Sequence, residues 1–181
     1  HALILDRKFF FWLCKNAKNI INRKDKKALT YAIIKSCQIK AMIVARDEKE
    51  KSIRMILNFG HTFAHGLEGA KNFSKKINHG EAVLLGMMIA SQLSYKKKLL
   101  SKNEFNLVKK HYLELNLPIS LKGNFKKNEI SKILFFMKMD KKNTNNKIKL
   151  ILLSKIGKTR KLNSFNVTNN EIKKVLSESV A

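Results

Sequence analysis

The feature that most constrains the fold of this chain is the scarcity of residues that interrupt helices. Its 181 residues contain one proline and seven glycines, and apolar residues recur at steps of three and four through most of the sequence. Because one face of an α-helix repeats with this spacing, the pattern predicts a mainly helical domain. The expected helices cover residues 7–22, 26–46, 52–70, 80–97, 102–115, 128–139 and 169–177.

Two local patterns add to the expected helices. Ser101 followed by Glu104 is the sequence signature of a capping box at the start of a helix. After a polar loop over residues 141–146, the apolar run 148–153 and the Gly157-Lys158-Thr159 segment predict a small β-hairpin.

The composition favours one soluble domain with an ordinary core. Apolar residues make up 44% of the chain, and the net charge is +25. The lysines are scattered through nearly every segment, which favours a solvated basic surface or an anionic small substrate over a dedicated polyanion site. Aromatic residues are not interleaved with the basic clusters, so a nucleic-acid-binding module is only a distant alternative.

Cysteine usage and hydropathy both favour a cytoplasmic protein. Cys14 and Cys37 form no C-x-x-C pair, which suits a reduced compartment better than a disulfide scaffold. The longest uninterrupted apolar run, residues 82–90, is far shorter than the ~20 residues needed to span a bilayer. We therefore expect no membrane partner.

Three of the five histidines, His61, His65 and His79, fall close together in the sequence. On a helix His61 and His65 share one face, and His79 at the head of the next helix could return to meet them. Imidazole is the commonest protein ligand of zinc, and a catalytic zinc usually takes three protein ligands. Thr62 stands where zinc proteases carry glutamate, which disfavours protease chemistry. The spacing alone leaves both a metal site and a packing role open.

Several further motifs occur in order along the chain. They are Ser36-Cys37-Gln38-Ile39-Lys40, Asp47-Glu48-Lys49-Glu50, Ile53-Arg54, Leu57-Asn58-Phe59-Gly60-His61-Thr62-Phe63-Ala64-His65, His79-Gly80-Glu81-Ala82-Val83, Gly86-Met87 and Asp140-Lys141-Lys142. With these motifs the chain resembles the C-terminal domain of the 3-dehydroquinate synthase family of sugar phosphate cyclases. The resemblance implies a mainly α fold, a helical metal-binding domain with a small β-hairpin, as the second domain of an α/β plus α enzyme.

The resemblance also implies what precedes this segment in a longer polypeptide. The chain begins with His1 rather than methionine, so we expect a fragment whose residues 1–181 form the zinc- and substrate-binding domain. An N-terminal dinucleotide-binding domain and a glutamate metal ligand would lie upstream. We expect the segment alone to be inactive.

Roles are carried over residue by residue. His61 and His79 match the two histidine metal ligands, and His65 matches a catalytic histidine that is not a ligand, with helix packing as its alternative role. The substrate-binding matches are Lys40 and Arg54 for a carboxylate, Glu50 near the metal, Asn58 near the phosphate, and either Lys141 or Lys142 for the phosphate. Ser52, Ala64 and Gly66 depart from the family pattern by small changes in side-chain size.

The implied activity is that of a phosphorus–oxygen lyase of the shikimate pathway, which leads to chorismate and the aromatic amino acids. It converts 3-deoxy-D-arabino-heptulosonate 7-phosphate to 3-dehydroquinate and phosphate. The implied cofactors are NAD and Zn²⁺, with Co²⁺ as the other candidate ion, and the implied assembly is a homodimer. The alternatives are another NAD- and zinc-dependent sugar phosphate cyclase and a glycerol-dehydrogenase-like enzyme. The first would not need Lys40 and Arg54, because its substrate carries no carboxylate.

Overall fold

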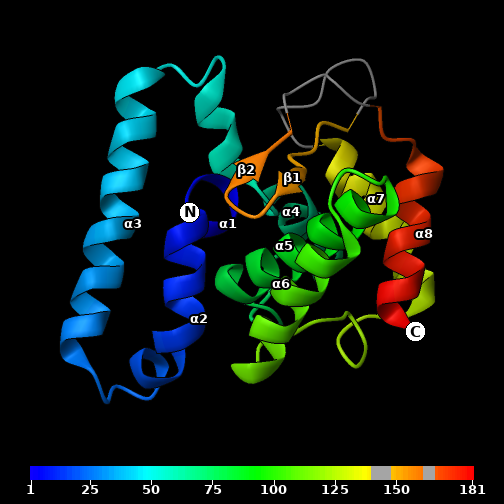
Figure 1. The fold of residues 1–181 in the computed structure, drawn as a ribbon. Helices are drawn as coiled ribbons and strands as arrows, with labels where there is room; N and C mark the ends of the chain where they lie inside the picture. The colour runs from blue at the N-terminus through cyan, green and yellow to red at the C-terminus, as the bar shows by residue number, and fades with distance from the viewer. Residues whose placement is uncertain (140–147, 161–165) are drawn as a thin grey trace.

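The computed structural model describes residues 1–139, 148–160 and 166–181 (Figure 1). In chain order the elements are α1 (Ala2–Leu5), α2 (Arg7–Ile21), α3 (Lys26–Arg46), the 3₁₀ helix η1 (Ile53–Asn58), α4 (His61–Ala70), α5 (His79–Lys96), α6 (Lys102–Glu114), the 3₁₀ helix η2 (Lys127–Glu129), α7 (Ile130–Met139), β1 (Leu153–Lys155), β2 (Lys158–Thr159) and α8 (Asn169–Val180). The mainly helical fold expected from the sequence is confirmed.

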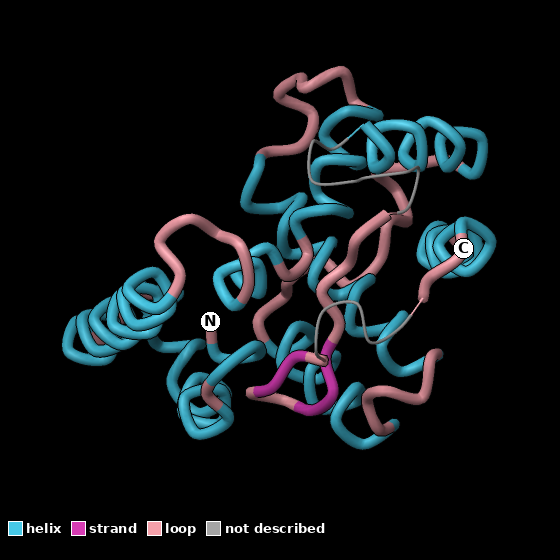
Figure 2. Tube along the Cα trace, turned by 90° about the horizontal axis from the view of Figure 1, so that it is seen from above, coloured by secondary structure: helices cyan, strands magenta, loops and turns pink. Residues whose placement is uncertain are grey.

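Helix α5 lies at the centre of the molecule. It packs against α4, α6, α8 and β1, while α2 and α3 form a pair on one side (Figure 1; Figure 2). Leu85, Ile89 and Leu93 on α5 are each 1% exposed. Burial of such side chains contributes about 1.5–3 kcal/mol each, so this helix anchors the core.

The sequence fixes most helix starts through side-chain caps. Asp6 accepts a hydrogen bond from Phe9 N at 2.8 Å, and Asp25 accepts one from Ala28 N at 2.9 Å. Each satisfies a backbone N–H that the first helical turn leaves without an intrahelical partner. A full capping box, formed by Asn78 with the Glu81 side chain, starts α5.

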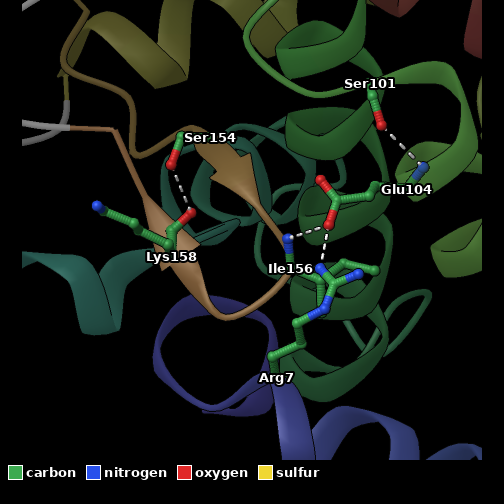
Figure 3. A network of polar contacts seen from close by, with 6 residues as sticks. All are labelled: Arg7, Ser101, Glu104, Ser154, Ile156 and Lys158. Atoms are coloured by element: carbon green, nitrogen blue, oxygen red, sulfur yellow. Dashed lines mark hydrogen bonds and ion pairs between the residues drawn. The ribbon is translucent and has the colours of Figure 1, made fainter.

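The predicted capping box at α6 forms only in part. Ser101 accepts from Glu104 N at 3.2 Å, but the Glu104 carboxylate faces away from the backbone of Ser101 (Figure 3). It forms an ion pair with Arg7 and accepts from Ile156 N at 3.3 Å. Glu104 thus links the start of α2 and the β-hairpin to α6, and this tertiary role replaces the expected local one.

The predicted hairpin is confirmed, although its strands are short. β1 and β2 pair antiparallel, with Leu153 opposite Thr159. At the turn Gly157 has φ 81°, and a Cβ there would lie 2.5 Å from Arg7 N, so the position favours glycine on two grounds. The expected loop over residues 141–146 lies outside the described residues.

The prediction of a single helix over residues 52–70 is wrong. The segment forms two helices, η1 and α4, which are separated at Gly60, whose φ of 84° is left-handed. Gly60 also lies against α5, because a Cβ on Gly60 would be 2.6 Å from Met87 N. The break turns the chain so that His61 becomes the first residue of a new helix.

Helix α3 lies at the outer edge of the molecule (Figure 1). Within the described ranges it is the one helix long and apolar enough to cross a bilayer by length and composition. Its lysines make contacts inside the protein: Lys35 pairs with Asp6 at 3.3 Å, and Lys40 lines a cavity described below.

Candidate metal and substrate site

Five of the predicted site residues line one cavity. Its volume is about 320 Å³, and its walls come from α3, the loop after it, η1, the start of α4 and the first residue of the chain. The lining residues are His1, Lys40, Glu50, Arg54, Leu57, Asn58 and His61. Two basic side chains, a carboxylate, an amide and two imidazoles therefore surround a space the size of a small metabolite.

The loop between α3 and η1 is held by Asp47. Its carboxylate accepts hydrogen bonds from Lys51 N at 2.9 Å, Ser52 N at 2.7 Å and Arg54 N at 3.0 Å. Desolvation acts to raise the pKa of Asp47, but these backbone hydrogen bonds outweigh it and lower the pKa to about 2. The sequence motif that contains Asp47 was identified, but Asp47 itself was given no role in the site.

The side chains of the cavity are positioned by contacts with each other and with the backbone. Asn58 donates from Nδ2 to Glu50 Oε1 at 2.6 Å, and Glu50 itself has a left-handed φ of 52°. Arg54 donates through one guanidinium nitrogen to Glu48 O at 2.5 Å. The rest of the planar guanidinium can bind an oxyanion in a fixed orientation.

The three clustered histidines come together as the sequence suggested. His61 lies between the other two: its ring centroid is 5.6 Å from that of His79 and 6.1 Å from that of His65. Close packing of α4 on α5 brings His79 to His61, since a Cβ on Gly86 would lie 3.2 Å from Ala64 N. His65 and His79 are not among the described residues that line the cavity.

The histidine geometry can be compared with what zinc requires. A Zn–N distance of about 2.0–2.1 Å puts each ring centroid ~3.2 Å from a shared ion, so two tetrahedral ligands have centroids ~5 Å apart. The separation of 5.6 Å between His61 and His79 fits this better than the 6.1 Å between His61 and His65. Of the two histidine pairs, His61 and His79 therefore come nearer to the spacing of two zinc ligands.

Two further observations concern this donor set. The described residues contain no group of three or more His, Cys, Asp or Glu placed to hold a metal. Glu68, which was not predicted, lies with its carboxylate 3.2 Å from His79 Nδ1. The sequence did contain a signal for it, because positions 61, 65 and 68 recur on one helix face. Lys141 and Lys142 lie outside the described residues.

Comparison with known proteins agrees with these motifs. Residues 1–143 match the family described as 3-dehydroquinate synthase C-terminal. A 3-dehydroquinate synthase of Pelagibacter ubique is 48% identical over 157 residues, which is 87% of this chain and 42% of that protein. One of Thermodesulfovibrio yellowstonii is 36% identical, over 98% of this chain and 48% of that protein. The chain thus spans less than half the length of these curated relatives.

Solved structures share the fold. A 2-epi-5-epi-valiolone synthase from Streptomyces hygroscopicus with NAD⁺ and Zn²⁺ bound has a TM-score of 0.82 at 23% identity, covering 98% of this chain and 47% of that one. A 2-deoxy-scyllo-inosose synthase complexed with carbaglucose-6-phosphate, NAD⁺ and Co²⁺ has a TM-score of 0.73 at 24% identity, covering 99% and 48%. At this identity the likeness concerns the fold, whereas the family match comes from the sequence and covers residues 1–143. The chain belongs to the 3-dehydroquinate synthase C-terminal family.

Proposed function

We propose that a polypeptide carrying this chain acts as a 3-dehydroquinate synthase, converting 3-deoxy-D-arabino-heptulosonate 7-phosphate to 3-dehydroquinate and phosphate. The observation that carries the proposal is the convergence of Lys40, Glu50, Arg54, Asn58 and His61 on one cavity. The family match and the names of the curated relatives support it. The chain then forms the zinc- and substrate-binding domain of the enzyme, and a dinucleotide-binding domain lies upstream.

The two cations of the cavity bind the substrate carboxylate. Arg54 is restrained by its bond to Glu48 O and by Asp47, which accepts from its backbone N–H. The Arg54 guanidinium can therefore bind a carboxylate without losing much side-chain entropy. Lys40 reaches the same space from α3 and adds a second positive charge.

The polar side chains next to these cations orient the hydroxyl groups. Asn58 and Glu50, already joined by a hydrogen bond, offer one amide and one carboxylate to the substrate from η1 and the preceding loop. His65, beside His61 on the same helix, is the candidate for proton transfer. Lys141 and Lys142 are the candidates for the phosphate.

His61 and His79 would hold a divalent metal, Zn²⁺ or Co²⁺. When bound, this metal would polarise the hydroxyl that is oxidised, while NAD would take up and later return the hydride. His1 lines the same cavity as His61. In a longer polypeptide, the residues directly before His1 would therefore lie close to the proposed metal ligand His61. A glutamate there would supply the third ligand, and for this reason we propose that residues 1–181 alone are inactive.

The second candidate is another sugar phosphate cyclase that also uses NAD and a divalent metal. Solved structures of two such enzymes support it through their fold, and their described ligands include NAD⁺ with Zn²⁺ or Co²⁺. Lys40 and Arg54 favour the synthase, because a neutral sugar phosphate offers them no carboxylate. A homodimer in the cytoplasm, with no membrane or nucleic-acid partner, completes the proposal.

The test is phosphate release by the polypeptide extended upstream to the length of its relatives. Release from 3-deoxy-D-arabino-heptulosonate 7-phosphate should require NAD, stop after chelation and return with Zn²⁺. Lys40→Ala and Arg54→Ala should each lower kcat/KM about tenfold or more, since a hydrogen bond to a charged group is worth about 1.5–3 kcal/mol. Lys109→Ala on the exposed face of α6 is the control. Turnover of a carboxylate-free sugar phosphate that neither variant impairs would favour the second candidate.

A further inference from the structure

The Glu68 carboxylate lies against one nitrogen of a proposed metal ligand. Its two oxygens are 3.2 Å and 3.3 Å from His79 Nδ1. The Glu68 side chain is only 17% exposed, whereas that of His79 is 59% exposed. The Glu68 carboxylate is therefore the more buried partner. The His79 imidazole is more exposed to solvent and lies beside His61.

The contact joins two well-anchored helices. Glu68 is in the last turn of α4, and His79 is the first residue of α5, directly after the Asn78 cap. The capping box fixes the start of α5, and the close approach of Gly86 to α4 fixes the two helices against each other. The arrangement therefore does not depend on a mobile loop.

No other described group occupies the Glu68 carboxylate through an ion pair. Lys71, the residue that follows α4, pairs instead with Glu129 Oε1 at 2.8 Å. His79 is the partner that the described ion pairs give to Glu68.

We infer that Glu68 is the positioning residue for His79, holding the Nδ1–H tautomer so that Nε2 is presented to a divalent cation. A ligating histidine commonly donates its second ring N–H to a carboxylate, which fixes the ring and raises its basicity as a ligand. The inference rests on the ligand role of His79 in the proposed function. Glu68 acts through His79 and does not touch the substrate.

The experiment uses the polypeptide extended to the length of its relatives. Zinc affinity is measured by competition with a chromophoric chelator for the wild type and for the variants Glu68→Ala, Glu68→Gln and His79→Ala. Glu68→Ala should weaken zinc binding about 10–100-fold, and less than His79→Ala does. Glu68→Gln keeps a hydrogen-bond acceptor but loses the charge, so its zinc affinity should lie between those of Glu68→Ala and the wild type. Glu178→Ala, which loses an ion pair with Lys96 far along the chain, should bind zinc as the wild type does.

A second measurement reads the tautomer without metal. In the ¹⁵N NMR spectrum of the metal-free protein at a pH where His79 is neutral, Nδ1 should carry the proton in the wild type, and this preference should vanish in Glu68→Ala. Unchanged zinc affinity in a folded Glu68→Ala protein would overturn the inference, as would an Nε2–H tautomer in the wild type. A loss equal to that of His79→Ala would make Glu68 a ligand instead. A wild type that binds no zinc through His79 would overturn both the inference and the metal assignment, whereas zinc binding without turnover would overturn only the proposed function.

Discussion

Replacing Gly86 by alanine should separate the two helices that carry the histidines. A Cβ at Gly86 would lie 3.0 Å from the carbonyl carbon of Gly60 and closer still to its oxygen. The obstacle is backbone, which cannot rotate away as a side chain can. Relief therefore requires α5 to move from the start of α4, where His61 lies.

The cost follows from two opposing terms. Overpacking a core costs about 1–3 kcal/mol, and a backbone obstacle puts Gly86→Ala at the upper end of that range. Alanine regains about 1 kcal/mol of helix propensity over glycine, leaving a net loss of ~2 kcal/mol. For a chain of this size that loss lowers Tm by about 4–8 °C. Zinc affinity should fall as well, because His79 moves away from His61.

The assay is thermal unfolding followed by circular dichroism, with zinc competition on the same samples. Gly80→Ala is a matched control in α5, because a Cβ there meets only Asn78 Oδ1, at 3.4 Å. Gly80→Ala should leave Tm unchanged or raise it by a few degrees. Wild-type stability and zinc affinity in Gly86→Ala would refute the argument that this close approach sets the histidine geometry.

Three other predictions concern positions outside the two histidine ligands. Gly66→Ala should lower Tm, because its Cβ would lie 2.9 Å from Ile133 O on α7; an unchanged denaturation midpoint would contradict this. Asp47→Asn should lower the free energy of unfolding at pH 7. The stability difference between variant and wild type should shrink as the pH falls from 3.8 towards 2, because the Asp47 carboxylate, whose pKa is lowered in the folded state, loses its charge and its stabilising effect over that range. A constant difference in urea midpoints across that range would count against it. Glu104→Ala removes the acceptor of Ile156 N and should speed amide hydrogen exchange there, whereas unchanged exchange would show that this hydrogen bond does not protect the hairpin turn.

Much of the fold could be predicted because its signals are local. The apolar periodicity predicts α2 and α3 within a residue or so of the observed ranges, and the caps at Asp6 and Asp25 are seen only in the structure. The division at Gly60 could not be predicted from periodicity, since the apolar spacing continues through it. That break depends on the backbone of Met87, which is remote in sequence and close only in the fold.

The candidate site divides in the same way. The motifs identified Lys40, Arg54 and His61, and the structure places all three at one cavity. Spacing along one helix puts Glu68 on the face of His61, but it could not reveal that Glu68 contacts His79 of the next helix, nor that Asp47 accepts hydrogen bonds from the loop carrying Arg54. These contacts join segments whose relation is set by tertiary packing, so the residue types alone do not specify them.

A crystal structure of the extended polypeptide grown with zinc, with anomalous diffraction recorded at the zinc edge, would locate the metal relative to the three histidines. We expect one strong peak contacted by a nitrogen of His61 and by Nε2 of His79, with the Glu68 carboxylate on Nδ1 of His79. A peak held by His65 in place of His79, or zinc bound away from all three histidines, would contradict it.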